Sequence, residues 1–268
     1  ISQLNNLRVY LEANYIYIER LKNFLQVDNF STIQGEKQFN KLENQIEFKN
    51  IDFKHQNSKF AFENFELKIP ANKTTGLIGI SGSGKTTLVD LLLKIYYPYN
   101  GQILFDGTDI NLFNNSSLRN KISYVSQDAL FFNRSIDENL NLLTNKSKDF
   151  SELFDELNLS SFKENKNQII GSGGINLSSG QKQKFNFIRA YLKEAEILIL
   201  DEPTSNLDYE SQNILKNYLN EIKGTKTVIV VTHTASILSI CENIVVIENG
   251  KLVQSGTPSE VKNKSGYS

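Results

Sequence analysis

The sequence contains one cysteine, two histidines and no methionine among its 268 residues. Cys241 has no second cysteine with which to form a disulfide, and without a Cys/His cluster no structural zinc site is expected. This composition fits a reducing compartment. The absence of methionine, together with a first residue Ile1, predicts that the sequence is a piece of a longer polypeptide.

The sequence also lacks an excess of either charge and any long apolar run. Lys and Arg number 29 against 30 Asp and Glu, a formal net charge of -1, so there is no broad basic field of the nucleic-acid-binding kind. No stretch approaches about eighteen consecutive apolar residues, and no leader with a cleavage site precedes the body. Neither a membrane span nor a secretion signal is therefore expected in these residues, whereas 39% hydrophobic content allows a substantial core.

The first part of the chain divides into a periodic and a non-periodic stretch. From Leu4 to Leu25, apolar side chains recur at steps of three, four and seven, which predicts an amphipathic helix over residues 1–27. Two interpretations stay open: an ordinary helix packed on the body, or the cytoplasmic end of a helix that descends from elsewhere. The polar stretch 28–45 has no period and predicts a linker, so the compact domain is expected over residues 46–268.

The body of the chain alternates between strand and helix patterns. Residues 46–53 and 60–69 alternate apolar and polar side chains, while the apolar runs 197–200 and 227–231 are typical of strands inside a parallel sheet. A strand at 75–78 precedes a helix at 87–95, and residues 244–254 predict a closing hairpin. The expected fold class is α/β, with an antiparallel β portion in front.

A glycine-rich loop lies between the strand at 75–78 and the helix that follows. It reads Gly79-Ile80-Ser81-Gly82-Ser83-Gly84-Lys85-Thr86 and fits G-x-x-x-x-G-K-[ST]. Such glycines let backbone N–H groups face a phosphate at the start of the helix. Lys85 is expected on the terminal phosphates, Thr86 on Mg²⁺ and Thr87 in the first helical turn. The loop predicts ATP or GTP binding by residues 79–87.

Two adjacent carboxylates follow the apolar run 197–200. Asp201 at the strand tip is suited to hold Mg²⁺, directly or through water, and Glu202 is suited to polarise an attacking water. Neighbouring residues on a strand point in opposite directions, so the two carboxylates need not do the same job. We expect Lys85 and Glu202 to be catalytic groups of a nucleotide hydrolase.

Four further segments resemble motifs of the nucleotide-binding domain of an ATP-binding cassette (ABC) transporter, and the resemblance extends from about Ile46 to Gly256. They are the signature-like Leu177-Ser178-Ser179-Gly180-Gln181, the Q-loop-like Tyr124-Val125-Ser126-Gln127, the D-loop-like Ser205-Asn206-Leu207-Asp208, and Val231-Thr232-His233. The resemblance implies a P-loop NTPase core with an antiparallel β subdomain and an α-helical signature subdomain. It also implies ATP and Mg²⁺ as ligands.

The resemblance further implies that two such domains close head to tail. Each ATP would then lie between the loop of one chain and the signature of the other. Nucleotide contacts across the dimer are expected from Ser178, Ser179, Gly180, Gln181 and Asp208. Gln127 is expected to sense Mg²⁺ and the attacking water, and His233 to hydrogen-bond the γ-phosphate.

Three segments resemble the exporter branch of the family. They are Phe131–Asn139 after the Q-loop, Gly171–Gly174 before the signature, and the amphipathic start, which resembles the end of a last transmembrane helix. The implied partners are a second nucleotide-binding domain, as homodimer or heterodimer, and a transmembrane domain of the full-length chain. The implied location is the cytoplasmic face of the cell membrane, with no nucleic-acid partner.

Three positions depart from the family pattern. Ser179 replaces the usual second glycine of the signature, and Ser172 replaces a customary glutamate. His55 lies where the family carries an aromatic residue that stacks on adenine; an imidazole can stack with less area. A solvent-exposed His55 is the alternative.

The sequence leaves two other functions open beside an exporter ATPase. One is a catalytically weak regulatory cassette of a heterodimeric transporter, which the Ser179 departure keeps possible. The other is a soluble ABC ATPase that acts on nucleic acid or ribosomes, although no tandem cassette or inserted zinc element is visible.

Overall fold

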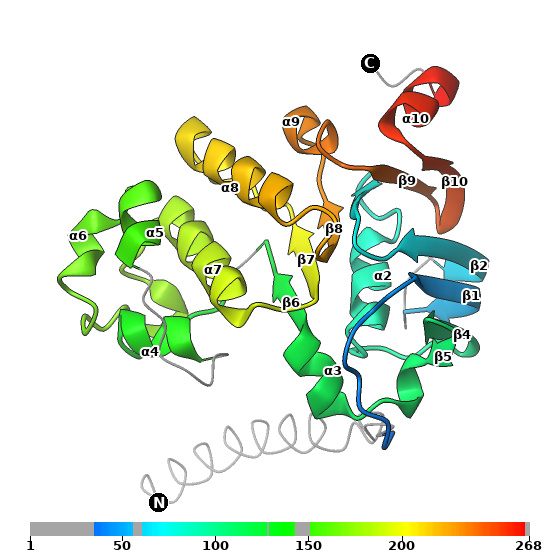
Figure 1. Cartoon of the computed structure of the whole chain (residues 1–268), viewed down its shortest axis with the longest axis horizontal. Helices are drawn as coiled ribbons and strands as arrows, with labels where there is room; N and C mark the ends of the chain where they lie inside the picture. Colours follow the sequence, from blue (N-terminus) through cyan, green and yellow to red (C-terminus); the bar gives the residue numbers. More distant parts are fainter. Residues whose placement is uncertain (1–34, 56–60, 128, 143–150, 266–268) are drawn as a thin grey trace, which may run out of the picture.

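The computed structural model describes residues 35–55, 61–127, 129–142 and 151–265. Two β-sheets and a set of surrounding helices form the described part (Figure 1). The helix predicted over residues 1–27, and the predicted linker as far as residue 34, lie outside the described residues. Within those residues, no helix is both long and apolar enough to cross a membrane.

The smaller sheet is antiparallel and has the strand order β2-β1-β4-β5. Its strands are β1 (Gln45–Lys54), β2 (Ala61–Pro70), β4 (Asn100–Phe105) and β5 (Thr108–Asp109). Asp106 and Gly107 join β4 to β5 with φ angles of 49° and 79°, the left-handed conformation that a two-residue hairpin turn requires. This sheet is the antiparallel β portion predicted from the alternating patterns at 46–53 and 60–69.

The larger sheet has the order β10-β9-β3-β8-β7-β6, and neighbouring strands from β9 to β6 are parallel. Its strands are β3 (Thr74–Ile78), β6 (Ile122–Val125), β7 (Ile197–Asp201), β8 (Thr227–Val231), β9 (Asn243–Glu248) and β10 (Lys251–Gly256). β10 pairs antiparallel with β9, so the predicted closing hairpin is confirmed. Both β7 and β8 are buried at every position, because side chains cover both faces of the sheet.

The two faces of the larger sheet belong to two different hydrophobic clusters. Ile197 and Ile199 of β7 join a cluster with the antiparallel sheet and helix α2 (Lys85–Leu92), whereas Leu198 and Leu200 join a cluster with helix α7 (Ser179–Lys193). Figure 1 shows α2 on one side of the central strands and α7 with α8 (Tyr209–Glu221) on the other. The predicted α/β class with an α-helical subdomain is confirmed.

Shorter helices complete the described fold. They are η2 (Ile110–Leu112), α3 (Asn115–Lys121), α4 (Ile136–Asn141), α5 (Ser151–Glu156), α6 (Ser160–Lys163), η3 (Ser172–Gly174), α9 (Ala235–Leu238) and α10 (Pro258–Ser265). α4 begins with a capping box, in which the Ser135 hydroxyl accepts from the backbone N–H of Glu138 while the Glu138 carboxylate accepts from Ser135. α4, α5, α6 and α7 form the helical subdomain on the left of Figure 1, α3 lies below the sheet, and α10 lies at the upper right beside β10.

The described part of the predicted linker packs against the domain. Phe39 and Leu42 are only 4% and 2% exposed and join the core of the antiparallel sheet. The carboxylate of Asp106 accepts hydrogen bonds from the backbone N–H groups of Glu43, Asn44 and Gln45. An irregular segment with two anchoring apolar side chains has no sequence period, so the pattern could not reveal this packing.

Candidate functional site

The glycine-rich loop joins the end of β3 to the start of α2, as predicted. Gly79 lies directly against the backbone of β9. A Cβ atom added there would lie 2.1 Å from the carbonyl oxygen of Ile247, so no side chain fits. Gly82 and Gly84 have φ angles of 78° and 112°, which only glycine adopts readily. The backbone of Ser83 is held on both sides, since its N–H donates to Ile80 and its carbonyl accepts from Gly250.

Lys85 begins α2 and places its ammonium group inside the curve of the loop. Nζ donates to the carbonyl oxygens of Gly79 at 2.6 Å and Ile80 at 3.1 Å. Burial lowers the pKa of this ammonium group, while the carboxylates of Glu202 and Asp201 act in the opposite direction. The loop therefore presents backbone N–H groups and one cation to the same space, which is the donor set that a phosphate requires.

Asp201 is the last residue of β7 and is 8% exposed. The hydroxyl of Tyr124, on the neighbouring strand β6, donates to its Oδ2 at 3.3 Å. Burial raises the pKa of Asp201, and the hydrogen bond from Tyr124 and the charge of Lys85 oppose that rise. A partly desolvated carboxylate at a strand tip is suited to bind a divalent cation, which restores the ionised form.

Glu202 leaves the strand in an unusual conformation. Its φ angle is 45°, in the left-handed region that few residues other than glycine occupy. The backbone N–H donates to Val231 at 2.8 Å, which keeps the residue next to β8. Burial is the largest influence on the carboxyl group and raises its pKa, while nearby His233 acts to lower it.

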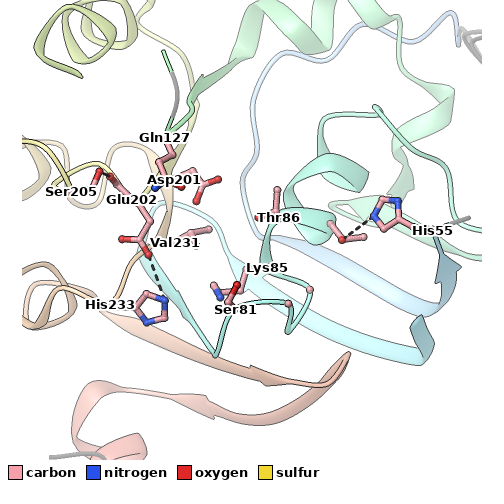
Figure 2. Close-up of a pocket in the computed structure, with 13 residues that line it drawn as sticks. His55, Ser81, Lys85, Thr86, Gln127, Asp201, Glu202, Ser205, Val231 and His233 are labelled. Carbon is pink, nitrogen blue, oxygen red and sulfur yellow. Dashed lines mark hydrogen bonds and ion pairs between the residues drawn. The ribbon is translucent and has the colours of Figure 1, made fainter. Parts of the chain in front are cut away.

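His233 follows β8 and faces Glu202 across the top of the sheet. Its Nε2 lies 3.6 Å from Oε1 of Glu202, and its side chain is 60% exposed. Figure 2 shows the ring and the carboxylate side by side, with Lys85 and Ser81 of the loop opposite them. Because β7 and β8 are parallel neighbours, their carboxyl ends bring these two residues to one edge of the sheet.

The loop, the two carboxylates and His233 surround one cavity of about 520 Å³. This volume lies within the range of small-molecule sites, about 300–1,000 Å³. The predicted site residues on its wall are His55, Ser81, Gly82, Gly84, Lys85, Thr86, Thr87, Gln127, Asp201, Glu202 and His233. The residues present fit a Mg²⁺-nucleotide, because Lys85, Ser81 and Thr86 lie on one side of the cavity and the carboxylates of Asp201 and Glu202 on the other (Figure 2).

His55 lies at the end of the cavity formed by the antiparallel sheet. Its Nε2 is 3.2 Å from the hydroxyl of Thr87, and its ring stands perpendicular to those of Phe53 and Tyr96 at 4.8 and 4.9 Å. The contact with Thr87 fixes the imidazole beside the first turn of α2. Stacking of adenine on His55 stays a prediction.

The signature-like residues do not line this cavity in the same chain. Ser178 is the N-cap of α7, where its hydroxyl accepts from the N–H of Gln181 at 3.2 Å and the Gln181 side chain accepts from Ser178 at 2.9 Å. Because the Ser178 hydroxyl acts as the acceptor in this capping box, its proton is available to donate to another group. Ser179 is exposed at the helix start, next to Gly180. The exposed start of α7 therefore lies outside the lining of its own chain's cavity.

Asp208, predicted to contact nucleotide, does not line the cavity either. Its carboxylate accepts from the backbone N–H of Ser211 at 2.8 Å and caps α8. It also pairs with Lys184 of α7 at 2.8 Å. These contacts, led by that with Lys184, hold the pKa of Asp208 well below its usual range. In this structure the side chain joins two helices, which a motif match alone did not indicate.

Sequence reasoning missed three residues at the site. Ser205 and Val231 line the cavity, although neither was among the predicted site residues. Tyr124 reaches Asp201 from β6. The signal for Val231 was available, because it ends an apolar run immediately before His233; the contact of Tyr124 depends on β6 lying beside β7, and strand order is not written in the sequence.

Several known proteins are similar to this chain in sequence. A family model described as "ABC transporter" matches residues 62–205. The heterocyst differentiation ATP-binding protein HepA of Nostoc sp. is 34% identical over 99% of this chain and 45% of its own length. The exotoxin translocation ATP-binding protein PaxB of Pasteurella aerogenes is 36% identical over 94% of this chain and 36% of its own. The ATP-dependent lipid A-core flippase of Salmonella typhimurium is 34% identical over 87% and 41%.

A solved structure has the same fold. It is described as a bacterial Atm1-family ABC exporter with ATP bound, and it superposes with a TM-score of 0.82 at 23% identity over 97% of this chain and 47% of that chain. At this identity the likeness concerns the fold alone. The chain thus spans less than half the length of the relatives and the structure described above.

Proposed function

The chain belongs to the ABC transporter family, and on that premise we propose that it is the ATP-hydrolysing domain of an exporter. The observation that carries the proposal is the meeting of the phosphate loop, Asp201, Glu202 and His233 around one cavity. The names of relatives, which include translocation proteins and a flippase, support the export function. Transport itself would require a protein as long as these relatives, of which this chain covers less than half.

In the proposed reaction, the loop and Lys85 bind the phosphates of ATP through N–H groups and one ammonium. Thr86, Asp201 and Gln127 would hold Mg²⁺, which when bound stabilises the negative charge that develops on the phosphates. Glu202 orients the attacking water and accepts its proton. His233, 3.6 Å from Glu202, keeps that carboxylate in place and donates a hydrogen bond to the γ-phosphate.

We further propose that two chains close head to tail around ATP. The support is that residues 178–181 do not line the cavity of their own chain and that Ser178 and Ser179 are exposed, so a second chain would supply this wall of the site. Hydrolysis removes the charge that bridges the chains and lets them part. The remaining partner would be a membrane-spanning domain, which locates the chain at the cytoplasmic face of the cell membrane.

Phosphate release measured across a range of protein concentrations tests the proposal. Because two chains would complete each site, turnover per chain should rise with protein concentration before it saturates. Turnover that does not depend on concentration would argue against the head-to-tail site. Binding of ATP without any turnover would favour the regulatory-cassette alternative.

A further inference from the structure

Gln183 of α7 makes an unusual set of contacts for a buried side chain. It is 3% exposed, and its amide nitrogen donates to the carbonyl oxygen of Glu202 at 2.9 Å and lies 3.4 Å from the hydroxyl of Ser205. Its amide oxygen accepts from the backbone N–H of Asn206 at 2.9 Å. One side chain therefore satisfies backbone groups on both sides of the segment that follows the catalytic carboxylate.

Two neighbouring contacts hold the same segment against the same helix. A Cβ atom added to Gly180 would lie 2.9 Å from the carbonyl oxygen of Asn206, so the start of α7 is packed closely on the segment. At the segment's other end, Lys184 pairs with Asp208 at 2.8 Å. The first two turns of α7 and residues 202–208 thus form one unit, with the signature-like residues at its exposed end.

The contact with Glu202 matters because the backbone of that residue is constrained. A glutamate with a φ angle of 45° retains that conformation only where its surroundings hold it. The N–H of Glu202 is held by Val231, and its carbonyl is held by Gln183 and by Ser205. Loss of the Gln183 bond would let the backbone relax and move the carboxylate, and small displacements of a catalytic group are costly.

We infer that Gln183 is a positioning residue that couples the signature end of α7 to the carboxylate of Glu202. The inference rests on the proposed head-to-tail function. When residues 178–181 engage the nucleotide held by a partner chain, the same helix sets the position of Glu202 in its own chain. Gln183 is thereby a link between the two nucleotide sites of a dimer.

The substitution Gln183→Met tests this link, because methionine has similar length and volume but none of the three hydrogen bonds. We expect kcat for ATP hydrolysis to fall about tenfold, with KM unchanged and cooperativity in ATP lost. Binding of a fluorescent ATP analogue to the dilute chain should equal that of wild type, because Gln183 does not line the cavity.

Gln212 provides a matched control. It lies on α8, and its amide nitrogen donates to the carbonyl oxygens of Leu207 at 3.0 Å and Thr204 at 3.4 Å, so it holds the same segment without contacting Glu202 or Asn206. Gln212→Met should keep the wild-type kcat and cooperativity. Equal losses in the two variants would overturn the inference, because general loosening of the segment would then explain both.

A second variant keeps the test decisive if Gln183→Met does not fold. Gln183→Glu preserves shape and the acceptor for Asn206 but removes the donor to Glu202, and the same fall in kcat at unchanged analogue binding is expected. Wild-type kcat and cooperativity in a folded Gln183 variant would refute the coupling. If wild type itself shows no turnover, the proposed function has failed, and the two failures are therefore distinguishable.

Discussion

At the scale of single residues, burial and backbone conformation determine what the two carboxylates can do. Asp201 is 8% exposed and bonded by Tyr124, which suits a fixed cation ligand. Glu202 is held in the left-handed region beside His233, which aims its carboxylate across the cavity. The different surroundings of Asp201 and Glu202 therefore support the different roles proposed for their carboxylates.

Removal of the Glu202 charge should separate binding from hydrolysis. We expect Glu202→Gln to bind MgATP as wild type does, because the loop and Asp201 are intact, and to hydrolyse it at least about 100-fold more slowly. Single-turnover hydrolysis and an ATP-analogue titration on the same sample measure both quantities. Wild-type turnover in this variant would remove Glu202 from the proposed mechanism.

Removal of the Lys85 charge should instead weaken the binding of the nucleotide. Lys85→Ala is expected to weaken nucleotide affinity about tenfold or more, because a charge-assisted contact to phosphate is lost. Isothermal titration with ATP gives the affinity directly. Lys68→Ala is the control, since Lys68 is a surface cation that pairs with Glu47 and whose side chain is 65% exposed. The affinity of this variant for ATP should match that of wild type.

At the scale of elements, helix starts determine where the site's donors point. α2 begins directly after the phosphate loop, and its first residues line the cavity. α7 begins with a capping box at Ser178, which does not line the cavity. The start of α8 is closed by Asp208, which also pairs with α7. Asp208 thus joins α7 to α8, and this cap can be tested by stability alone.

Loss of the Asp208 cap should destabilise the domain. We expect Asp208→Ala to lower the free energy of unfolding by about 1 kcal/mol at neutral pH, the usual value of an N-cap. Urea unfolding followed by circular dichroism measures this change. Because half of the side chain is exposed, we assign no further energy to the pair with Lys184.

A second variant at this position, Asp208→Asn, has an expected pH dependence relative to wild type. The pKa of Asp208 is lower in the folded chain than its ordinary value, so its ionised form stabilises the fold above the unfolded pKa. That contribution is lost as pH falls through the folded pKa. The stability difference between wild type and Asp208→Asn should therefore shrink in acid; a difference that grows in acid would contradict the lowered pKa.

At the scale of the whole molecule, the phosphate loop and the signature-like residues 178–181 lie apart, and the proposed head-to-tail dimer treats them as two halves of one site. The phosphate loop lines the cavity, whereas the exposed start of α7 does not. A dimer arranged head to tail would bring each half to the other chain. This arrangement makes a mixing experiment possible.

Two inactive variants should restore activity when they are mixed. Lys85→Ala disables the loop, and Ser179→Glu puts a negative charge where the partner's γ-phosphate would lie, at an exposed first helical position that tolerates acidic residues. Each variant alone should show little turnover, whereas a mixed dimer has one site with an intact loop and an intact signature. Phosphate release from the mixture measures the rescue, and its absence would contradict the head-to-tail dimer.

Much of the fold followed from local patterns. The strands at 46–53, 75–78, 197–200 and 227–231 and the closing hairpin were predictable, because alternation and apolar runs report which faces are buried. The packing of residues 35–44 was not, since Phe39 and Leu42 are isolated apolar residues in a polar stretch. Their burial depends on residues far along the chain, such as Phe105 and Phe113, whose rings contact that of Phe39.

The sequence by itself determined the ligand chemistry of the site, because the glycine spacing, Lys85 and the Asp201-Glu202 pair are local and each carries a fixed chemical property. Only the tertiary structure decided which groups meet: His233 beside Glu202, Tyr124 on Asp201 and Gln183 on the backbone carbonyl of Glu202. The physical reason is that these contacts depend on strand order and helix packing. Both are decided by the burial of residues far apart in the sequence, which produces no periodic pattern within any one segment.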